Sequence, residues 1–174
     1  GLIKPDSGQI NLDGINLLET NNNKSWKASI AHVPQNIYLT DSSIEENIAF
    51  GIKRENIDYE LVKLCAKKAQ IDEYIKKLSN GYKTFIGERG VKLSGGQKQR
   101  IGIARALYRK AKILFLDEAT SALDNETEKD FLKALDNLSN DITLVIVAHR
   151  LTTIKKCNKI IELKEGEIIN QKNN

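Results

Sequence analysis

The chain has 174 residues, of which 40% are hydrophobic and 29% are charged. This length suits one domain with a hydrophobic core, and the composition argues against both a disordered and a membrane-embedded chain. The 27 basic and 23 acidic side chains are interleaved, so the formal charge of +4 forms no basic run that would follow a nucleic-acid backbone. We therefore expect no nucleic-acid partner.

Membrane spans, signals and metal sites find little support in the sequence. The longest apolar run, 142–148, has seven residues, whereas a spanning helix needs about 20, so we expect no direct membrane insertion. The first residues show no basic region followed by an apolar region, so no secretory signal is expected. Cys65 and Cys157 lack metal-ligand spacing, which predicts two buried, reduced thiols. Because the chain opens at Gly1 and contains no methionine, it is expected to be a fragment.

The first part of the chain shows short strand and helix signals. Alternation over 9–12 predicts a strand ended by the Asp13-Gly14 turn, and 30–33 predicts a strand stopped by Pro34. Ser42 and Ser43 each precede a glutamate by three residues, which is the spacing of a helix capping box. Helices are expected near 24–28, 43–50, 58–69 and 72–78.

The second part has the pattern of an α/β protein. Glycines at 81, 87 and 90 interrupt the helical texture before a long helix expected from about 96 to 108. Apolar runs at 113–116 and 143–147 predict strands buried on both faces of a parallel sheet. A helical pattern at 126–138 joins them into a βαβ unit. A helix at 151–155 and a hairpin of strands 159–163 and 167–171 are expected to follow.

Two adjacent carboxylates follow the first of these apolar runs. Asp117 at a strand end can serve Mg²⁺, and Glu118 beside it can polarise an attacking water. Taken alone, Asp-Glu after a strand is also the pattern of an ordinary solvated loop. The pair therefore needs support from other motifs.

The segment 93–97, Leu-Ser-Gly-Gly-Gln, is a sharper signal. Two glycines and Ser94 at a helix N-terminus expose backbone N–H groups and a hydroxyl toward an anion. A serine-capped helix start explains the same letters, and both interpretations stay open on this segment alone.

The order and spacing of five motifs favour a functional interpretation of these segments. Asp117 lies 23 residues after Ser94, and His149 lies 32 residues after Asp117, so that each falls at the end of an element. The sequence resembles the ATP-binding cassette family over essentially its whole length. The matching motifs are Val33-Pro34-Gln35 (Q-loop), 93–97 (signature), 113–118 (Walker B with its glutamate), 121–124 (D-loop) and Ala148-His149-Arg150 (switch histidine).

The resemblance implies a fold and a set of roles. The fold would be a P-loop NTPase core of the RecA-like α/β type with an inserted α-helical subdomain. Asp117 would serve Mg²⁺ together with Gln35, which would also sense the nucleotide. Glu118 would be the general base on water, and His149 would touch the γ-phosphate of ATP.

The same resemblance implies a head-to-tail dimer of two nucleotide-binding domains. Residues Ser94, Gly95, Gly96 and Gln97 would press on the γ-phosphate of ATP held by the opposite subunit, and Asp124 would act across that interface. The implied division of the chain is 1–35 as the remainder of the N-terminal core, 36–92 as the helical subdomain, and 93–174 as the signature helix and C-terminal core.

One part of the family pattern is missing. No Gly-Lys-Ser or Gly-Lys-Thr occurs in the chain, so the Walker A loop that cradles phosphates is absent. The aromatic loop that stacks on adenine is missing too. Because the family places both just upstream of the segment that starts here, truncation at the N-terminus explains the loss better than degeneration. We expect the fragment alone to be inactive.

Two segments favour the exporter branch. Phe85 to Gly90 resembles the X-loop of exporters, although Glu88 and Arg89 equally suit an exposed charged turn, and 43–51 resembles an exporter segment. The resemblance then implies an ATP-hydrolysing domain bound to a transmembrane domain at the cytoplasmic face of the inner membrane, transporting a lipid or lipid-linked saccharide. One alternative is a non-transport cassette ATPase. It is disfavoured because Ser94 lies only 59 positions after Gln35 and the segment between them shows no heptads. The other alternative is a regulatory module that completes a partner's site.

Overall fold

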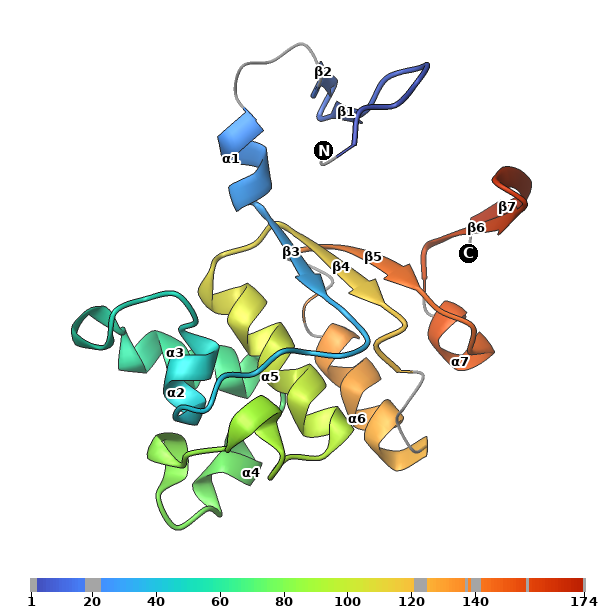
Figure 1. Cartoon of the computed structure of the whole chain (residues 1–174). Coiled ribbons are helices and arrows are strands. Elements are labelled where there is room, and N and C mark those ends of the chain that lie inside the picture. Colours follow the sequence, from blue (N-terminus) through green and yellow to red (C-terminus); the bar gives the residue numbers. More distant parts are fainter. Residues whose placement is uncertain are drawn as a thin grey trace.

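A three-stranded parallel sheet forms the centre of the molecule (Figure 1). The computed structural model describes residues 3–17, 23–120, 125–136, 138, 142–155 and 157–173. The strands lie in the order β3 (Ile30–Val33), β4 (Ile113–Asp117) and β5 (Thr143–Val147). Val33 pairs with Leu116, and Asp117 pairs with Val147, so the carboxyl ends of all three strands lie at one edge.

Two helices cover one face of this sheet (Figure 1). They are α5 (Gly95–Tyr108), which begins within the signature segment, and α6 (Asn125–Asp136), which joins β4 to β5 as the predicted βαβ unit. Leu114 and Leu116 of β4 and Phe131 of α6 are at most 1% exposed. Burial of these apolar side chains, at about 25 cal/mol per Å², is the main force that holds the helices on the sheet.

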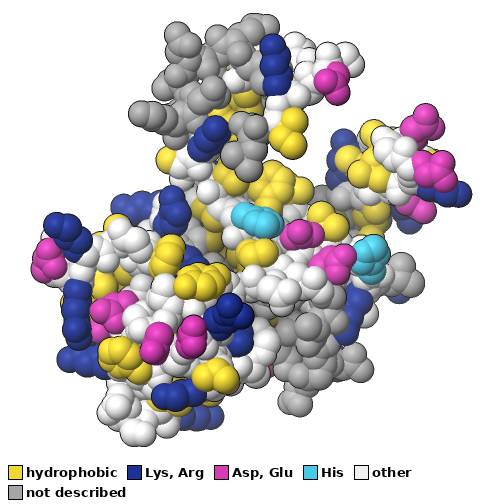
Figure 2. Space-filling view, viewed as in Figure 1, with side chains coloured by type: hydrophobic (Ala, Val, Ile, Leu, Met, Phe, Trp, Pro, Cys, Tyr) yellow, Lys and Arg dark blue, Asp and Glu magenta, His cyan; other side chains and the backbone are white. Residues whose placement is uncertain are grey.

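The opposite face of the sheet is more exposed than the sequence predicts. Phe115, Val145 and Val147 are 37%, 38% and 53% exposed, so the expectation of strands buried on both faces is wrong. Successive side chains of a strand point to opposite faces, and α5 and α6 cover only the face that carries Leu114 and Leu116. Figure 2 shows apolar side chains open to solvent in the middle of the molecule.

A cluster of short helices packs beside the sheet. It contains α2 (Ile44–Ile48), α3 (Tyr59–Lys68) and α4 (Asp72–Lys76), together with 3-10 turns at Arg54–Asn56, Gly81–Lys83 and Glu88–Gly90. Helix α5 contacts α2 and α3 on one side and β3 on the other, so it belongs to both parts of the fold. The division at residues 36 and 92 therefore stays a prediction.

The start of α2 resolves an ambiguity left by two neighbouring serines. Ser43 caps the helix, because its Oγ accepts from the backbone N–H of Glu46 at 3.2 Å and its own N–H donates to Glu46 Oε2 at 2.9 Å. Ser42 bonds instead to the side chains of Thr40 and Asn47. The predicted capping box is thus confirmed at Ser43.

Asn47 and Arg105 connect this helical cluster to α5. The Asn47 side chain is fully buried and donates to Thr40 O, Ser42 Oγ and Ser43 O. Arg105 donates to Asn47 O at 2.9 Å and to the carbonyl of the exposed Tyr38 at 3.0 Å. Burial lowers the pKa of Arg105 to about 10, which still leaves it charged at neutral pH. The pair thereby fixes the segment between β3 and α2.

Two hairpins complete the chain. One joins β1 (Asn11–Leu12) to β2 (Ile15–Asn16), and the other joins β6 (Lys159–Lys164) to β7 (Glu167–Asn173), as predicted for the C-terminal end. Both turns place two residues at positive φ, among them Gly14 and Gly166, which is the conformation of tight hairpin turns. Both cysteines are free thiols, but only Cys65 is buried, whereas Cys157 is half-buried.

The loop after β5 is held by the buried carboxylate of Glu128 on α6. Glu128 is 5% exposed and accepts from Arg150 Nη1 at 2.6 Å and from Thr152 Oγ1 at 2.8 Å. Thr153 Oγ1 donates to the same Oε1 atom at 3.2 Å. This network anchors the short helix α7 (Leu151–Ile154) against α6.

Asn47→Ala should destabilise the fold by about 2–4 kcal/mol, because it leaves several polar groups of residues 40–43 without their side-chain partner, while Arg105 keeps its bond to the backbone carbonyl of residue 47. Urea unfolding followed by circular dichroism measures this difference. Asn80→Ala is the control, since Asn80 is exposed and its side chain does not cap the turn that follows it, so its effect should stay within about 0.5 kcal/mol. Equal effects of the two changes would contradict the role of Asn47.

Glu128→Gln should destabilise the fold by an amount that depends on pH. Burial alone would raise the pKa of Glu128, but the hydrogen bonds from Arg150 and Thr152 outweigh it and hold the pKa below its ordinary value of 4.5. A lowered folded pKa stabilises above the unfolded value and loses this effect as pH falls through the folded value. The difference in unfolding free energy between wild type and variant should therefore be constant above about pH 5 and shrink below pH 4.5. Urea titrations at several pH values test this; a difference that grows in acid would refute it.

Candidate functional site

The turn after β4 gives the two adjacent carboxylates different positions. Asp117 is the last residue of the strand, whereas Glu118 has a φ of 45°, in the left-handed region that non-glycine residues seldom adopt. The backbone N–H of Glu118 donates to Val147 O at 3.0 Å. The chain is thus turned at Glu118 while it is still tied to β5. Such local strain is a frequent feature of functional sites.

Glu118 lies beside His149, the histidine that the sequence analysis selected. His149 Nε2 and Glu118 Oε1 are 3.2 Å apart, although the residues are 31 positions apart in the sequence. The imidazole side chain is 81% exposed and the carboxylate 33%, so a water molecule or ligand can reach both. A carboxylate and an imidazole within hydrogen-bonding distance are suited to accepting and moving a proton.

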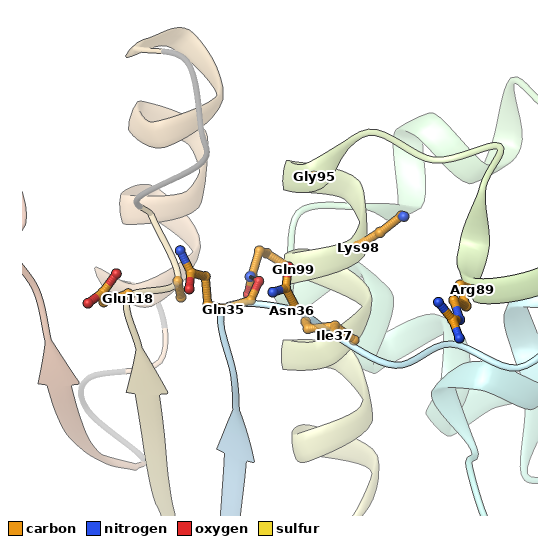
Figure 3. Close-up of a pocket in the computed structure, with 9 residues that line it drawn as sticks. Gln35, Asn36, Ile37, Arg89, Gly95, Lys98, Gln99 and Glu118 are labelled. Carbon is orange, nitrogen blue, oxygen red and sulfur yellow. Dashed lines mark hydrogen bonds between the residues drawn. The ribbon is translucent and has the colours of Figure 1, made fainter.

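Gln35, Glu118 and Gly95 line one pocket of about 480 Å³ at the carboxyl edge of the sheet (Figure 3). Glu118 lies at one end, and the basic side chains of Lys98 and Arg89 lie toward the other. The N-terminus of a helix also carries a partial positive charge. The pocket therefore combines a carboxylate with groups that attract an anion. Its remaining lining residues are Asn36, Ile37, Gln99 and Ala119.

The signature segment begins α5 as a capped helix. Ser94 Oγ accepts from Gln97 N–H at 3.3 Å, and Ser94 N–H donates to Gln97 Oε1 at 2.9 Å. The interpretation as a serine cap is therefore confirmed. A hydroxyl that accepts in this way keeps its own proton as a donor, so contact of Ser94, Gly95, Gly96 and Gln97 with a phosphate is compatible with the cap and stays a prediction.

Gln99 is a residue of this site that the sequence analysis missed. Its side chain is 5% exposed, and Nε2 donates to the carbonyls of Pro34 at 3.2 Å and Gln35 at 2.8 Å. Helix α5 can approach this closely because Gly102 has no side chain; a Cβ there would lie 2.3 Å from Ile37 Cδ1. The signal was present in the sequence, since a polar residue on the buried stripe of a helix must find a partner.

Three predicted site residues remain: Asp117 and Gln35, which were predicted to bind the metal ion, and Asp124 in the D-loop. Within the described ranges, no three His, Cys, Asp or Glu side chains gather to hold a metal ion. Mg²⁺, however, commonly uses only one or two carboxylates plus substrate phosphates, so the oxygen-bearing Asp117 and Gln35 fit such an ion. The D-loop segment 121–124, which contains Asp124, lies outside the described residues.

The sequence of the chain is also similar to known proteins. The family described as ABC transporter matches residues 1–121. An ATP-dependent lipid A-core flippase of Pectobacterium atrosepticum is 47% identical over 96% of this chain and 28% of its own length. The mouse ATP-binding cassette sub-family B member 5 is 48% identical over 96% of this chain and 13% of its own. The chain thus spans less than a third of either relative.

A solved structure gives the same result for the fold. A bacterial Atm1-family ABC exporter with ATP bound superposes with a TM-score of 0.83 and 40% identity, over 97% of this chain and 29% of that one. Among the described residues, no helix is both long and apolar enough to cross a membrane. From the family match, the relatives and the shared fold, the chain belongs to the ABC transporter family and has the fold of its nucleotide-binding domains, that of a P-loop NTPase.

Proposed function

We propose that this chain is the ATP-hydrolysing part of an exporter or flippase, working at the cytoplasmic face of a membrane. The observation that carries the proposal is the Glu118–His149 pair, 3.2 Å apart at the carboxyl edge of the sheet. The similarity to exporters and to lipid A-core flippases supports this branch of the family. We further propose a lipid or a lipid-linked saccharide as the transported substrate.

In the proposed reaction, a water molecule attacks the γ-phosphate of ATP. Glu118 accepts a proton from that water, and His149 donates a hydrogen bond to the γ-phosphate and orients the water. Gln35 and Asp117 would hold Mg²⁺, which neutralises phosphate charge when it is bound. Lys98 and the N-terminus of α5 add positive potential at the pocket.

A second nucleotide-binding domain would complete the site. In a head-to-tail dimer, Ser94, Gly95, Gly96 and Gln97 would contact the nucleotide of the opposite domain, with Asp124 at the same interface. The N–H groups at the start of a helix favour binding of such an anion.

The helical cluster would dock on the transmembrane domain. Tyr38, Phe85 and Val91 are 62%, 54% and 74% exposed, and Phe85 and Val91 flank along the sequence the exposed turn that contains Glu88 and Arg89. The interpretation of Glu88-Arg89 as an exposed turn fits this placement, and a docking role would use the same exposure. Gln99 and Arg105 join the 34–38 segment to α5, which gives a physical route between the nucleotide pocket and Tyr38.

Glu118→Gln should reduce steady-state ATP hydrolysis by about 10²–10⁴-fold in the intact transporter that contains this chain, because the amide keeps the shape but cannot accept the proton. Binding of Mg-ATP should be retained. A phosphate-release assay and a nucleotide-binding titration measure the two quantities. Glu167→Gln on the exposed strand β7 is the control. Turnover of the Glu118 variant within about tenfold of wild type would remove Glu118 from this role and make His149 the next candidate.

Charge reversal at Glu88 or Arg89 should reduce transport and its stimulation of ATP hydrolysis, because the turn would no longer match the transmembrane domain. Basal hydrolysis should remain largely intact after reversal of Glu88, whereas reversal of Arg89, which lines the pocket, should also weaken nucleotide binding. Substrate transport in proteoliposomes and cross-linking from Tyr38 to the cytoplasmic loops measure this contact. Glu60→Lys on α3 is the matched control, since it reverses an exposed charge elsewhere in the helical cluster. Normal transport by both variants, together with the absence of any cross-link, would contradict the docking role and leave only the interpretation of Glu88-Arg89 as an exposed turn.

A further inference from the structure

A single buried carboxylate connects the two loops that carry Glu118 and His149. We propose that Glu128 is a positioning residue that sets the separation between these two side chains, through the loop that follows β5. The inference rests on the proposed function of the pair. Glu128 itself lies on α6, which the sequence motifs do not include.

The loop that carries His149 is anchored on both sides. On its N-terminal side, the strand ladder fixes the chain as far as Val147, which pairs with Asp117. On its C-terminal side, Arg150 donates to Glu128 Oε2 at 2.6 Å. Only Ala148 and His149 lie between these two anchors. The position of the imidazole therefore depends directly on the Arg150–Glu128 contact.

The loop that carries Glu118 is reached through Thr153. Thr153 Oγ1 contacts Glu128 Oε1 at 3.2 Å and Thr120 Oγ1 at 3.4 Å. Thr120 follows Glu118 by two residues and is 4% exposed, and Thr153 is 1% exposed. The same carboxylate thus reaches both loops of the pair, one through Arg150 and the other through Thr153.

The chemistry of this contact requires a carboxylate. Glu128 uses both oxygens as acceptors, Oε2 toward Arg150 and Oε1 toward Thr152 and Thr153. A glutamine has one acceptor oxygen and one NH₂ donor, so it cannot receive both sets of bonds, and it leaves the Arg150 cation without its ion-pair partner. Glu128→Gln should therefore displace the loop while keeping the side-chain volume.

A buried ion pair also has a purely structural interpretation, and the chain offers a matched control for it. Asp72 is 4% exposed and binds Lys76 at 2.7 Å and the Tyr82 hydroxyl at 2.6 Å. It thus resembles Glu128 in burial and in the kinds of its partners, although Asp72 binds one cation and one hydroxyl whereas Glu128 binds one cation and two hydroxyls. Asp72→Asn should cost stability without acting on the Glu118–His149 pair.

The test is a double-mutant cycle on ATP hydrolysis by the intact transporter, with kcat and KM for Mg-ATP measured separately. A misplacement on the scale of an ångström can cost up to about 10²-fold in rate, so Glu128→Gln should lower kcat at least about tenfold and leave KM within about twofold. In the His149→Ala background the same change should lower kcat by less than about twofold, because a positioning residue acts only through its target. Asp72→Asn should leave kcat unchanged in both backgrounds.

The outcomes separate two failures. If His149→Ala alone leaves kcat unchanged, the proposed role of His149 fails. If His149→Ala lowers kcat but Glu128→Gln does not, or if the two effects multiply, the positioning role of Glu128 is overturned. Should the Glu128 variant fail to fold, Thr152→Ala decides, since it removes one hydrogen bond from the exposed side of the network. It should lower kcat about threefold in wild type and not at all with His149→Ala; no effect in wild type overturns the proposal.

Discussion

The common register of three parallel strands is the constraint on which the site depends. Because β3, β4 and β5 run in the same direction and end together, the residues that follow them meet at one edge of the sheet. Gln35 and Glu118 then line the same pocket, and His149 lies next to Glu118. A helix-covered face with Leu114 and Leu116 keeps this register, since a slip by one residue would turn both side chains toward solvent.

Helix α5 extends this arrangement into the helical cluster. Its first turn carries the signature residues, its middle holds the carbonyls of Pro34 and Gln35 through Gln99, and its last turn holds the carbonyl of Tyr38 through Arg105. The segment after β3 is therefore attached to one rigid helix at both ends. Motion of α5 and motion of this segment should be coupled, which is a physical requirement for any energetic coupling between the pocket and the proposed docking surface.

Local patterns in the sequence were enough to predict every strand of the described residues except β2, the α-helices, the βαβ unit and the C-terminal hairpin. Glu118 and His149 were selected from the family resemblance, and the structure places their side chains 3.2 Å apart; their roles stay predictions. Burial of both sheet faces was predicted wrongly, since apolar runs do not reveal which face a helix covers. A polar residue on the buried stripe of α5 indicated that Gln99 has a buried partner, but spacing along the chain does not identify its partners or those of Glu128, which lie more than 20 residues away.

The positive φ of Glu118 lowers the stability of the fold. A side chain held at positive φ costs about 1 kcal/mol relative to glycine, and asparagine tolerates the same conformation better than glutamate. Substitution of Glu118 by glycine or asparagine should therefore raise the thermal stability of the fold, although neither side chain can accept a proton as a carboxylate does. The proposed role of Glu118 as a base therefore conflicts with stability at this position. A screen for heat-tolerant variants of this chain would select changes at position 118, and under the proposed mechanism those variants would hydrolyse little ATP.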